Sequence, residues 1–295
     1  MFGDSEKRHA QHLTARGAEL LHTDPAGAEA CYWDAIRLDP ELYPAWFDLG
    51  LIYKWSRRWL ESFDCNLQAA ELVGERPEEP AWWNLGIAAT ALHRWDVARR
   101  AWRAYGVVLP DGDGPIEADL GYTPVRINPD AGAEVVWGHR IDPARVRLTS
   151  IPFPESGHRW ADVVLHDGEP RGSREFEGAQ RPVFNELVRW APSDMPTIVM
   201  TISSDGPDGA QQIDDLVGLI NRAGHMIEDW SRNTRLLCAH CSESDVPHDH
   251  VGVTVPEDGS FRRLGVAGPA EVVRELVDDW EFWPTRRCES FEVND

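Results

Sequence analysis

A short stretch near the C-terminus concentrates residue types that bind metal ions. Cys238 and Cys241 are separated by two residues, and after six further residues come His248 and His250. Two thiols with this spacing can bind one ion from a single tight turn. On an extended strand the two histidines point the same way, because side chains alternate between faces. The four side chains therefore predict a tetrahedral zinc site.

The same pattern allows other interpretations. One is a reduced surface dithiol beside unrelated histidines. A redox-active Cys-x-x-Cys is disfavoured, because the expected strand–motif–helix context is missing. Four protein ligands close the coordination sphere, which is typical of a structural ion. If one ligand were free, the zinc would be catalytic and Glu243 would be the nearest candidate base. We expect one structural zinc ion that joins two predicted strands, 234–238 and 251–255.

Ionisable residues also gather between positions 158 and 169. His166 with Asp167 or Asp162 would form an acid–base pair able to hydrolyse a bond, and His158 and Glu169 lie nearby in sequence. The Asp-Gly dipeptide after an apolar run is instead typical of a solvated hairpin turn. We favour the turn, and the chain has no Gly-x-Ser-x-Gly element that would present a nucleophile.

Composition limits the class of partner. The 295 residues include 50 Asp and Glu against 29 Lys and Arg, a net charge of −21. This charge repels phosphate backbones and anionic lipid, so nucleic acid and membranes are disfavoured and a basic partner is favoured. Five cysteines in a long chain do not indicate a disulfide framework. We find no signal-peptide core and no membrane-length apolar run, and we expect a cytoplasmic, bacterial protein.

The first third of the chain contains an internal repeat. Segment 44–50, Pro-Ala-Trp-Phe-Asp-Leu-Gly, matches segment 80–86, Pro-Ala-Trp-Trp-Asn-Leu-Gly, at an offset of 36 residues (80 − 44 = 36). Both resemble the tetratricopeptide (TPR) repeat, a helix pair with the pattern W-x2-L-G-x2-Y, then A-x3-F, then P. The positions that fit are Trp46, Leu49, Gly50, Tyr53, Trp82, Leu85, Gly86, Ala98, Trp102 and Pro110. In the first copy, Ser62 and Asn66 replace the usual Ala and Phe, and the spacing is two residues longer.

A weaker unit precedes these two. Its second helix is indicated by Ala28, Tyr32, Ala35 and Pro40, and its first helix is expected within residues 5–22. The resemblance implies a domain over residues 1–110 that consists of three stacked helix pairs.

The resemblance also implies a concave groove lined by the first helix of each pair. In this register the groove residues are Phe47, Leu51, Trp83 and Ile87. Their apolar side chains would bind a protein or peptide partner. The alternative is that the chain's own second domain or N-terminal helix covers them, because monomers avoid large exposed apolar patches.

A linker is expected over residues 111–125, where Gly and Pro are dense. Asp111 and Asp113 have the spacing of the first two ligands of a calcium loop. Pro115 and Ile116 then occupy the places of the third ligand and the obligatory glycine, so we reject calcium here.

Residues 126–295 change to short β-rich runs between turns and predict a mixed α+β domain. The expected strands are Glu134–His139, Arg145–Ile151, Asp162–Leu165, Thr197–Ser203, Thr234–Cys238, Val251–Val255 and Cys288–Val293. The expected helices are Ala210–Ala223, Ala270–Trp280 and a shorter Val183–Trp190. The helix Ala210–Ala223, with the strand Thr197–Ser203 before it and a strand near Met226–Trp230 after it, predicts a β-α-β unit. The domain resembles the C-terminal half of uncharacterised bacterial TPR proteins, a resemblance that implies no activity.

The expected fold class is thus a TPR-like helical hairpin stack followed by a mixed α+β domain with a zinc-stapled loop. We expect a non-enzymatic protein–protein interaction or adaptor protein, which could neutralise a basic partner as toxin-immunity proteins do. The alternative is a metal-assisted hydrolase or peptide-tailoring enzyme whose TPR stack delivers the substrate. The fourth zinc position, protein ligand or water, distinguishes the two.

Overall fold

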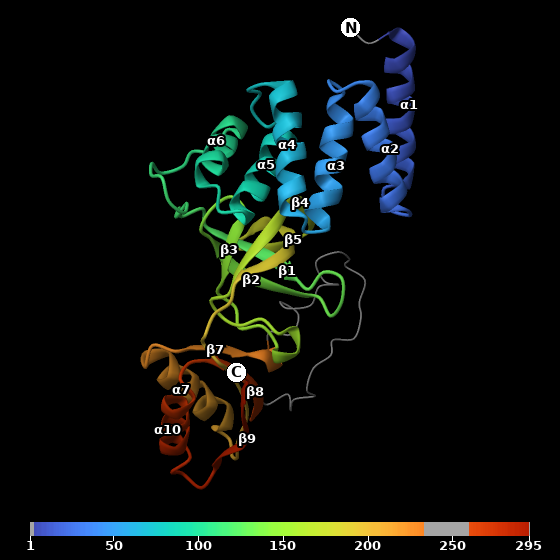
Figure 1. The fold of residues 1–295 in the computed structure, drawn as a ribbon. Helices are drawn as coiled ribbons and strands as arrows, with labels where there is room; N and C mark the ends of the chain where they lie inside the picture. The colour runs from blue at the N-terminus through green and yellow to red at the C-terminus, as the bar shows by residue number, and fades with distance from the viewer. Residues whose placement is uncertain (1–2, 233–259, 295) are drawn as a thin grey trace. The chain divides into compact units, whose positions relative to one another are not determined.

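The computed structural model describes residues 3–232 and 260–294. Internal contacts group residues 1–120 and 141–144 into one compact unit, and the chain from residue 121 onward, without 141–144, into another. None of the helices in the described ranges has the length and apolar character that a membrane span needs. The element order shows an α-helical N-terminal part, which is followed by a part built mainly on β-sheets (Figure 1).

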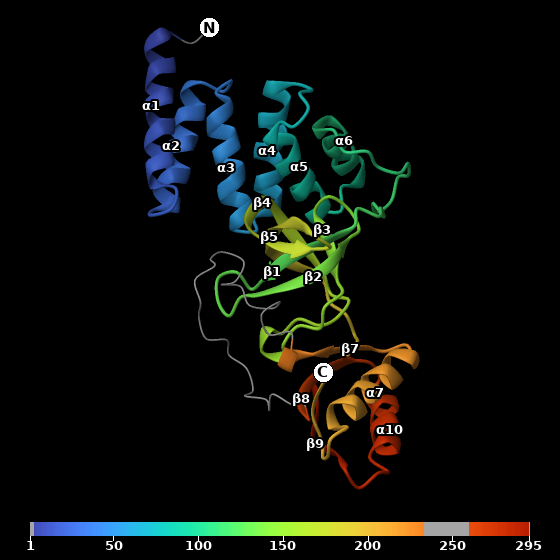
Figure 2. The same cartoon turned by 180° about the vertical axis from the view of Figure 1, so that it is seen from behind.

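The first unit contains six α-helices in antiparallel pairs, coloured blue to teal in Figures 1 and 2. They are α1 Asp4–Leu20, α2 Pro25–Leu38, α3 Tyr43–Trp55, α4 Trp59–Val73, α5 Pro80–Ala91 and α6 Trp95–Tyr105. Helices α2, α3 and α5 have proline in their first two positions, where its fixed φ suits the helix and its missing N–H costs nothing. The helices expected over the first 110 residues are present.

The three helix pairs share one close contact. In each pair a glycine of the first helix lies against a side chain of the second, so closely that an added Cβ would be 2.6–2.7 Å from that side chain. The pairs are Gly17 with Tyr32, Gly50 with Asn66, and Gly86 with Trp102. Any larger residue at these glycines would push the helices apart. The same contact recurs at a spacing of 33 (50 − 17) and then 36 (86 − 50) residues, which makes the three pairs structural repeats of one another.

The second unit begins with a closed five-stranded barrel. Its strands are β1 Tyr122–Ile127, β2 Glu134–Arg140, β3 Arg145–Leu148, β4 Val163–Phe176 and β5 Ala179–Ala191, and a short 3-10 helix, η1 Pro154–Ser156, follows β3. Successive strands pair antiparallel, and a parallel pairing of β1 with β5 closes the barrel. Alternate positions such as Val125, Ile127 and Val136 fill its interior.

Two expectations for the barrel are wrong. Residues 183–190 form part of strand β5 and not a helix, and the Asp-Gly dipeptide at 167–168 lies within β4 and not in a hairpin turn. Register shifts between β4 and β5 interrupt the strict in–out alternation, so buried residues fall side by side and imitate helical spacing. The hairpin turns instead at Glu177 and Gly178, whose φ angles of 51° and 74° suit a tight two-residue turn.

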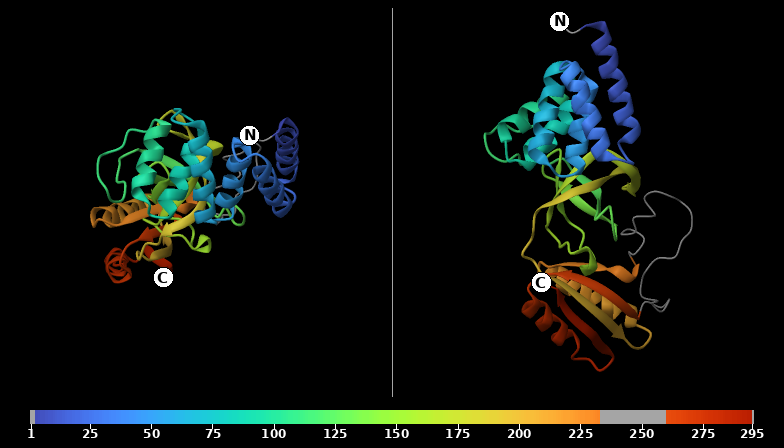
Figure 3. Two further views of the ribbon diagram at one scale, coloured as in Figure 1. Left: turned by 45° about the horizontal axis from the view of Figure 1, so that its top comes forward. Right: turned by 45° about the vertical axis from the view of Figure 1, so that its right-hand side comes forward.

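The chain then forms a four-stranded antiparallel sheet with two helices. The elements are β6 Thr197–Ser204, α7 Gly209–Arg222, β7 Met226–Asp229, β8 Phe261–Ala267, α10 Ala270–Trp280 and β9 Arg286–Asn294. The strand order is β7-β8-β6-β9 (Figure 3). Because β8 lies between β6 and β7, the predicted β-α-β unit is the split form of that motif within a β-α-β-β-α-β sequence. Two strands predicted at 234–238 and 251–255 lie outside the described residues.

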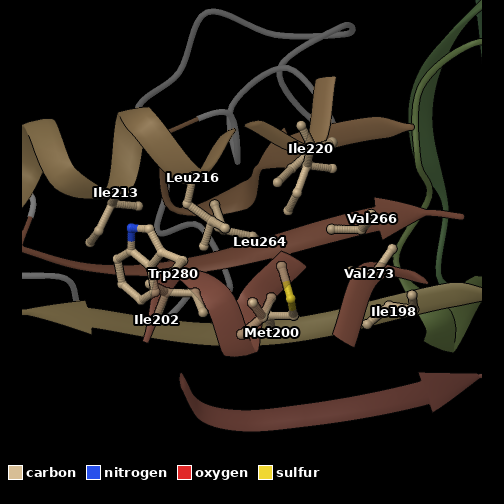
Figure 4. Packing of buried hydrophobic residues seen from close by; sticks show 12 residues of the cluster. Ile198, Met200, Ile202, Ile213, Leu216, Ile220, Leu264, Val266, Val273 and Trp280 are labelled. Carbon is tan, nitrogen blue, oxygen red and sulfur yellow. The ribbon is translucent and has the colours of Figure 1, made fainter. Parts of the chain in front are cut away.

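The sheet has buried residues on both faces. From β6, Ile198, Met200 and Ile202 pack with α7 and α10 in an apolar core (Figure 4). Val199, between them in sequence, points the other way and belongs to the cluster that also contains barrel residues and Trp230. Strand β6 therefore contributes to the cores of both halves of the second unit, which explains the uninterrupted apolar run Ile198–Val199–Met200.

Candidate functional site

The first helices of the three repeats form one layer, since α1 contacts α3 and α3 contacts α5. The predicted groove residues lie on two of these helices. Phe47 and Leu51 are one turn apart on α3 and half-buried, whereas on α5 Trp83 is half-buried and Ile87 is completely buried. The structure thus places all four on neighbouring first helices, with the α3 pair the more accessible.

Aromatic contacts explain the difference between the two helices. The Trp83 ring lies 5.0 Å from the Trp102 ring and 4.8 Å from the Tyr105 ring, both on α6. On α3, Phe47 stacks on Tyr43 of its own helix at 5.6 Å. Trp83 therefore packs within its own helix pair, whereas the ring contact given for Phe47 is with a residue of its own helix.

Polar side chains fix the spacing of the layer. The buried Lys54 ammonium of α3 donates to the Asn84 side-chain oxygen of α5 at 2.9 Å. The Tyr43 hydroxyl donates to Glu79, at the start of α5, at 2.6 Å. A buried ammonium is costly unless it is hydrogen-bonded, so these bonds favour one arrangement of α3 against α5.

The predicted zinc ligands Cys238, Cys241, His248 and His250, together with Glu243, lie outside the described residues. Within residues 3–232 and 260–294, no group of three or more His, Cys, Asp or Glu side chains is arranged to hold a metal ion. The zinc site stays a prediction.

In the second unit, the predicted acid–base residues His166, Asp162 and Asp167 are all buried. His166 is completely buried, and its Nδ1 donates to the backbone carbonyl of Asp167 at 2.6 Å. Burial, with the nearby Arg140 cation, lowers the pKa of His166 to about 3, so the ring is neutral and a very weak base near pH 7.

The neighbouring carboxylates have local partners of their own. Asp162 is fully buried and accepts from the backbone N–H groups of Arg159 at 3.0 Å and Ser193 at 2.6 Å. Asp167 accepts from the next backbone N–H at 2.7 Å, and exposed Glu169 pairs with Arg171. These hydrogen bonds and this ion pair hold turns and loops of the barrel.

The structure brings His158 together with a residue that the sequence did not single out. Nε2 of His158 lies 2.8 Å from Oε1 of Glu186, and both side chains are 6% exposed. The second Glu186 oxygen accepts from the Asn128 backbone N–H at 3.0 Å. The only hint in the sequence is that Glu186 is a single acid inside an apolar run of β5, where a buried charge requires a partner.

Both ring nitrogens of His158 face acceptors, because Nδ1 lies 3.2 Å from the Ser156 carbonyl. A proton on each nitrogen would satisfy both contacts, so this geometry favours the doubly protonated, positively charged ring. Burial alone would lower the pKa of His158, but the hydrogen bond and charge of Glu186 outweigh it and raise the pKa. With no nitrogen left to accept a proton from a substrate, the imidazolium is a structural cation.

Two further buried acids hold the same loop. Glu134 accepts from the Phe153 N–H and Glu228 from the Ile151 N–H, each at 3.2 Å. Burial raises the pKa of both carboxyl groups to about 7. Residues 150–158 are therefore anchored by ionisable side chains from the barrel and from β7. We call this set, Glu134, His158, Glu186 and Glu228, the loop-anchoring cluster.

A comparison with models of known protein families found no match, and a comparison with curated proteins found none either.

Proposed function

We propose that the chain is a non-enzymatic protein-interaction protein of the TPR type, whose helical repeat binds a protein or peptide partner. The observation that carries the proposal is the recurrent glycine contact in three successive helix pairs. It makes the helices a stack of equivalent units with one continuous layer of first helices, and such stacks commonly present that layer to a partner.

The first-helix layer offers the contacts that a peptide needs. Phe47 and Leu51 supply partly exposed apolar surface one turn apart, next to the polar Tyr43–Glu79 and Lys54–Asn84 bonds. The net charge of −21 favours a basic partner and speeds its encounter. We therefore propose a partner segment that combines an apolar anchor with Lys or Arg.

The enzymatic alternative has less support in the described residues. His158 has both nitrogens engaged, and His166 is neutral and enclosed. A metal-assisted hydrolase or peptide-tailoring enzyme would depend on a zinc ion with an open position and on Glu243, which lie outside the described residues.

Peptide selection tests the binding proposal. We would select phage-displayed random peptides on the immobilised full-length chain, synthesise an enriched peptide and measure its affinity by calorimetry. We expect the peptides to be basic with an apolar anchor, and the double substitution Phe47→Ala with Leu51→Ala to weaken binding by about tenfold or more. Leu60→Ala, a 50% exposed leucine on α4, is the matched control and should bind normally. Equal binding by the Phe47/Leu51 variant would overturn the proposed surface.

We further propose that Cys238, Cys241, His248 and His250 bind one structural zinc ion. Elemental analysis of the purified chain should find about one zinc per molecule. Cys238→Ser and His250→Ala should each lose it together with thermal stability, and Cys31→Ser, outside the set, should keep it. Zinc retained in His250→Ala at unchanged stability would indicate an open coordination sphere and favour the hydrolase alternative.

A further inference from the structure

Among the described strands, β9 forms the longer edge of the second sheet. It is nine residues long, and among the described strands it pairs with β6 alone. None of its described residues is fully buried, in contrast to β6, and the opposite edge, β7, has only four residues. A long unpaired edge presents a row of N–H and C=O groups that another strand can pair with.

A bulge gives β9 a local symmetry. Thr201 of β6 lies opposite Ser290, but the next residue, Ile202, lies opposite Cys288, so one residue of β9 is extra at this point. As a result Cys288 and Phe291, three positions apart, both pack against the helix-covered core. In a regular strand, residues separated by an odd number would face opposite sides. The bulge lies midway between them.

The charges of β9 are arranged with opposite signs at its two ends. Arg287 lies at the start and Glu292 near the end, and both are exposed. Arg287 makes an exposed contact with Asp205 at 3.3 Å, a kind of surface pair that contributes little. An antiparallel copy of the same strand would place each basic end against an acidic end.

We propose that β9 pairs antiparallel with β9 of a second copy of this chain, about a two-fold axis through the bulge. Arg287 then lies opposite Glu292 of the second copy, and Cys288 lies opposite Phe291 (287 + 292 = 288 + 291 = 579). Directly opposite residues in a sheet must share a face. This register satisfies that rule because the bulge shifts the alternation once between the two positions. Two four-stranded sheets thereby join into one, with two ion pairs across the join.

Exposed apolar residues at the ends of the strand support a second copy as the occupant. Phe282 and Trp283, immediately before β9, are 82% and 58% exposed, and Val293 at its far end is 42% exposed. In the antiparallel arrangement, the aromatic pair of one copy lies at the end of the strand where the other copy has Val293. The apolar surface left open on each chain is thus covered by the same surface of its copy.

Charge reversal tests this register. We would measure the mass of the full-length chain in solution by light scattering after size exclusion, over a range of concentrations. The expected mass is 66.6 kDa (2 × 33.3 kDa). Arg287→Glu and Glu292→Arg should each be monomeric, because each places two like charges opposite one another. An equimolar mixture of these two variants should recover the dimer, since every facing pair then has opposite charges.

The controls separate pairing from folding. Glu271→Arg makes the same change in charge as Glu292→Arg, but on the exposed face of α10, and it should leave the dimer intact. Circular dichroism of the two β9 variants should match the unmodified chain, because both positions are exposed. A monomer at all concentrations, a dimer that survives either reversal, or a mixture that stays monomeric would overturn the proposal.

Discussion

The barrel and the split β-α-β sheet lie next to each other in the second unit but are stabilised by different means. The core under α7 and α10 is mainly apolar, with Ile198, Met200 and Leu216 completely buried, and the buried Arg262 of β8 pairs with Asp214 of α7. The barrel has buried apolar residues too, yet its loop at 150–158 is fixed by the loop-anchoring cluster of three acids and one histidine. Folding of the sheet thus depends chiefly on burial of apolar area, and folding of the barrel depends on protonation to a larger extent.

This difference has a physical consequence. Apolar burial contributes roughly 25 cal/mol per Å² whatever the pH, and no proton binding enters it. A buried ionisable group contributes through the difference between its folded and unfolded pKa, so its contribution changes with pH. Substitutions in the sheet core and in the loop-anchoring cluster can destabilise the protein to a similar extent. The loss of stability should depend on pH for the cluster and should be nearly independent of pH for the sheet core.

The largest effect is expected in the sheet core. Trp280 is 4% exposed, packs with Ile213 and Leu216, and donates from its indole N–H to the Gln212 carbonyl at 2.8 Å. Trp280→Ala should lower the free energy of unfolding by about 4 kcal/mol. Urea denaturation at pH 6 and pH 9 should give the same loss. A loss that differed between the two pH values by more than about 1 kcal/mol would contradict the assignment of the contacts of Trp280 as apolar.

The elements of the sheet core could be predicted from the sequence where their buried positions are apolar, and they were missed where a buried position is charged. Helix α10 was predicted with its observed bounds, Ala270–Trp280, and α7 to within one residue at each end, because an apolar core on one face leaves a regular helical spacing. Strand β8 was not predicted. Its second and third residues are Arg262 and Arg263, and two consecutive charged residues do not indicate a buried strand, although Arg262 is buried. Arg262 is buried because Asp214 and the Ala210 carbonyl accept its hydrogen bonds.

In the barrel, polar residues occupy buried positions, and for this reason neither the fold of β5 nor the loop-anchoring cluster could be predicted from the sequence. Residues 183–190 were predicted as a helix but form part of β5, where Glu186 is buried against His158. His158 was listed beside Asp162 by proximity in sequence, but its partner is 28 residues away on β5. Pairings of this kind depend on strand register, which a single sequence does not specify once bulges interrupt the alternation.

The next largest effect should come from breaking the buried ion pair. Glu186→Gln keeps the size of the side chain but leaves the His158 imidazolium without a counter-charge, and we expect a loss of about 3 kcal/mol at pH 6. The raised pKa of His158 stabilises the fold below its unfolded pKa, and that stabilisation disappears as pH rises through the folded pKa. The loss should therefore be smaller at pH 9, unlike that of Trp280→Ala. Glu169→Gln, which removes an exposed acid paired with Arg171, is the control and should change stability by less than about 0.5 kcal/mol.

The smallest effect is expected for substitution of Glu134. It tests the comparison most directly, because above pH 7 this substitution should increase the free energy of unfolding. Burial raises the pKa of Glu134 from 4.5 to about 7, so the folded chain holds this proton more tightly than the unfolded chain does. Between these pKa values the folded state binds more protons, and stability must fall as pH rises from about 5 to 7. The loss attributable to Glu134 is on the order of 2 kcal/mol, and Glu228 adds a similar dependence.

Glu134→Gln replaces the carboxyl group by a neutral amide that can still accept from the Phe153 N–H. Its free energy of unfolding should decline less steeply over this pH range, and above pH 7 the variant should be more stable than the unmodified chain. Chemical denaturation at half-unit steps between pH 5 and 8 measures both slopes, with Glu169→Gln, an exposed acid of strand β4, as the matched control. If Glu134→Gln and the unmodified chain kept parallel profiles, the carboxyl group at 134 would be ionised throughout. The barrel would then owe its pH dependence to His158 and Glu228.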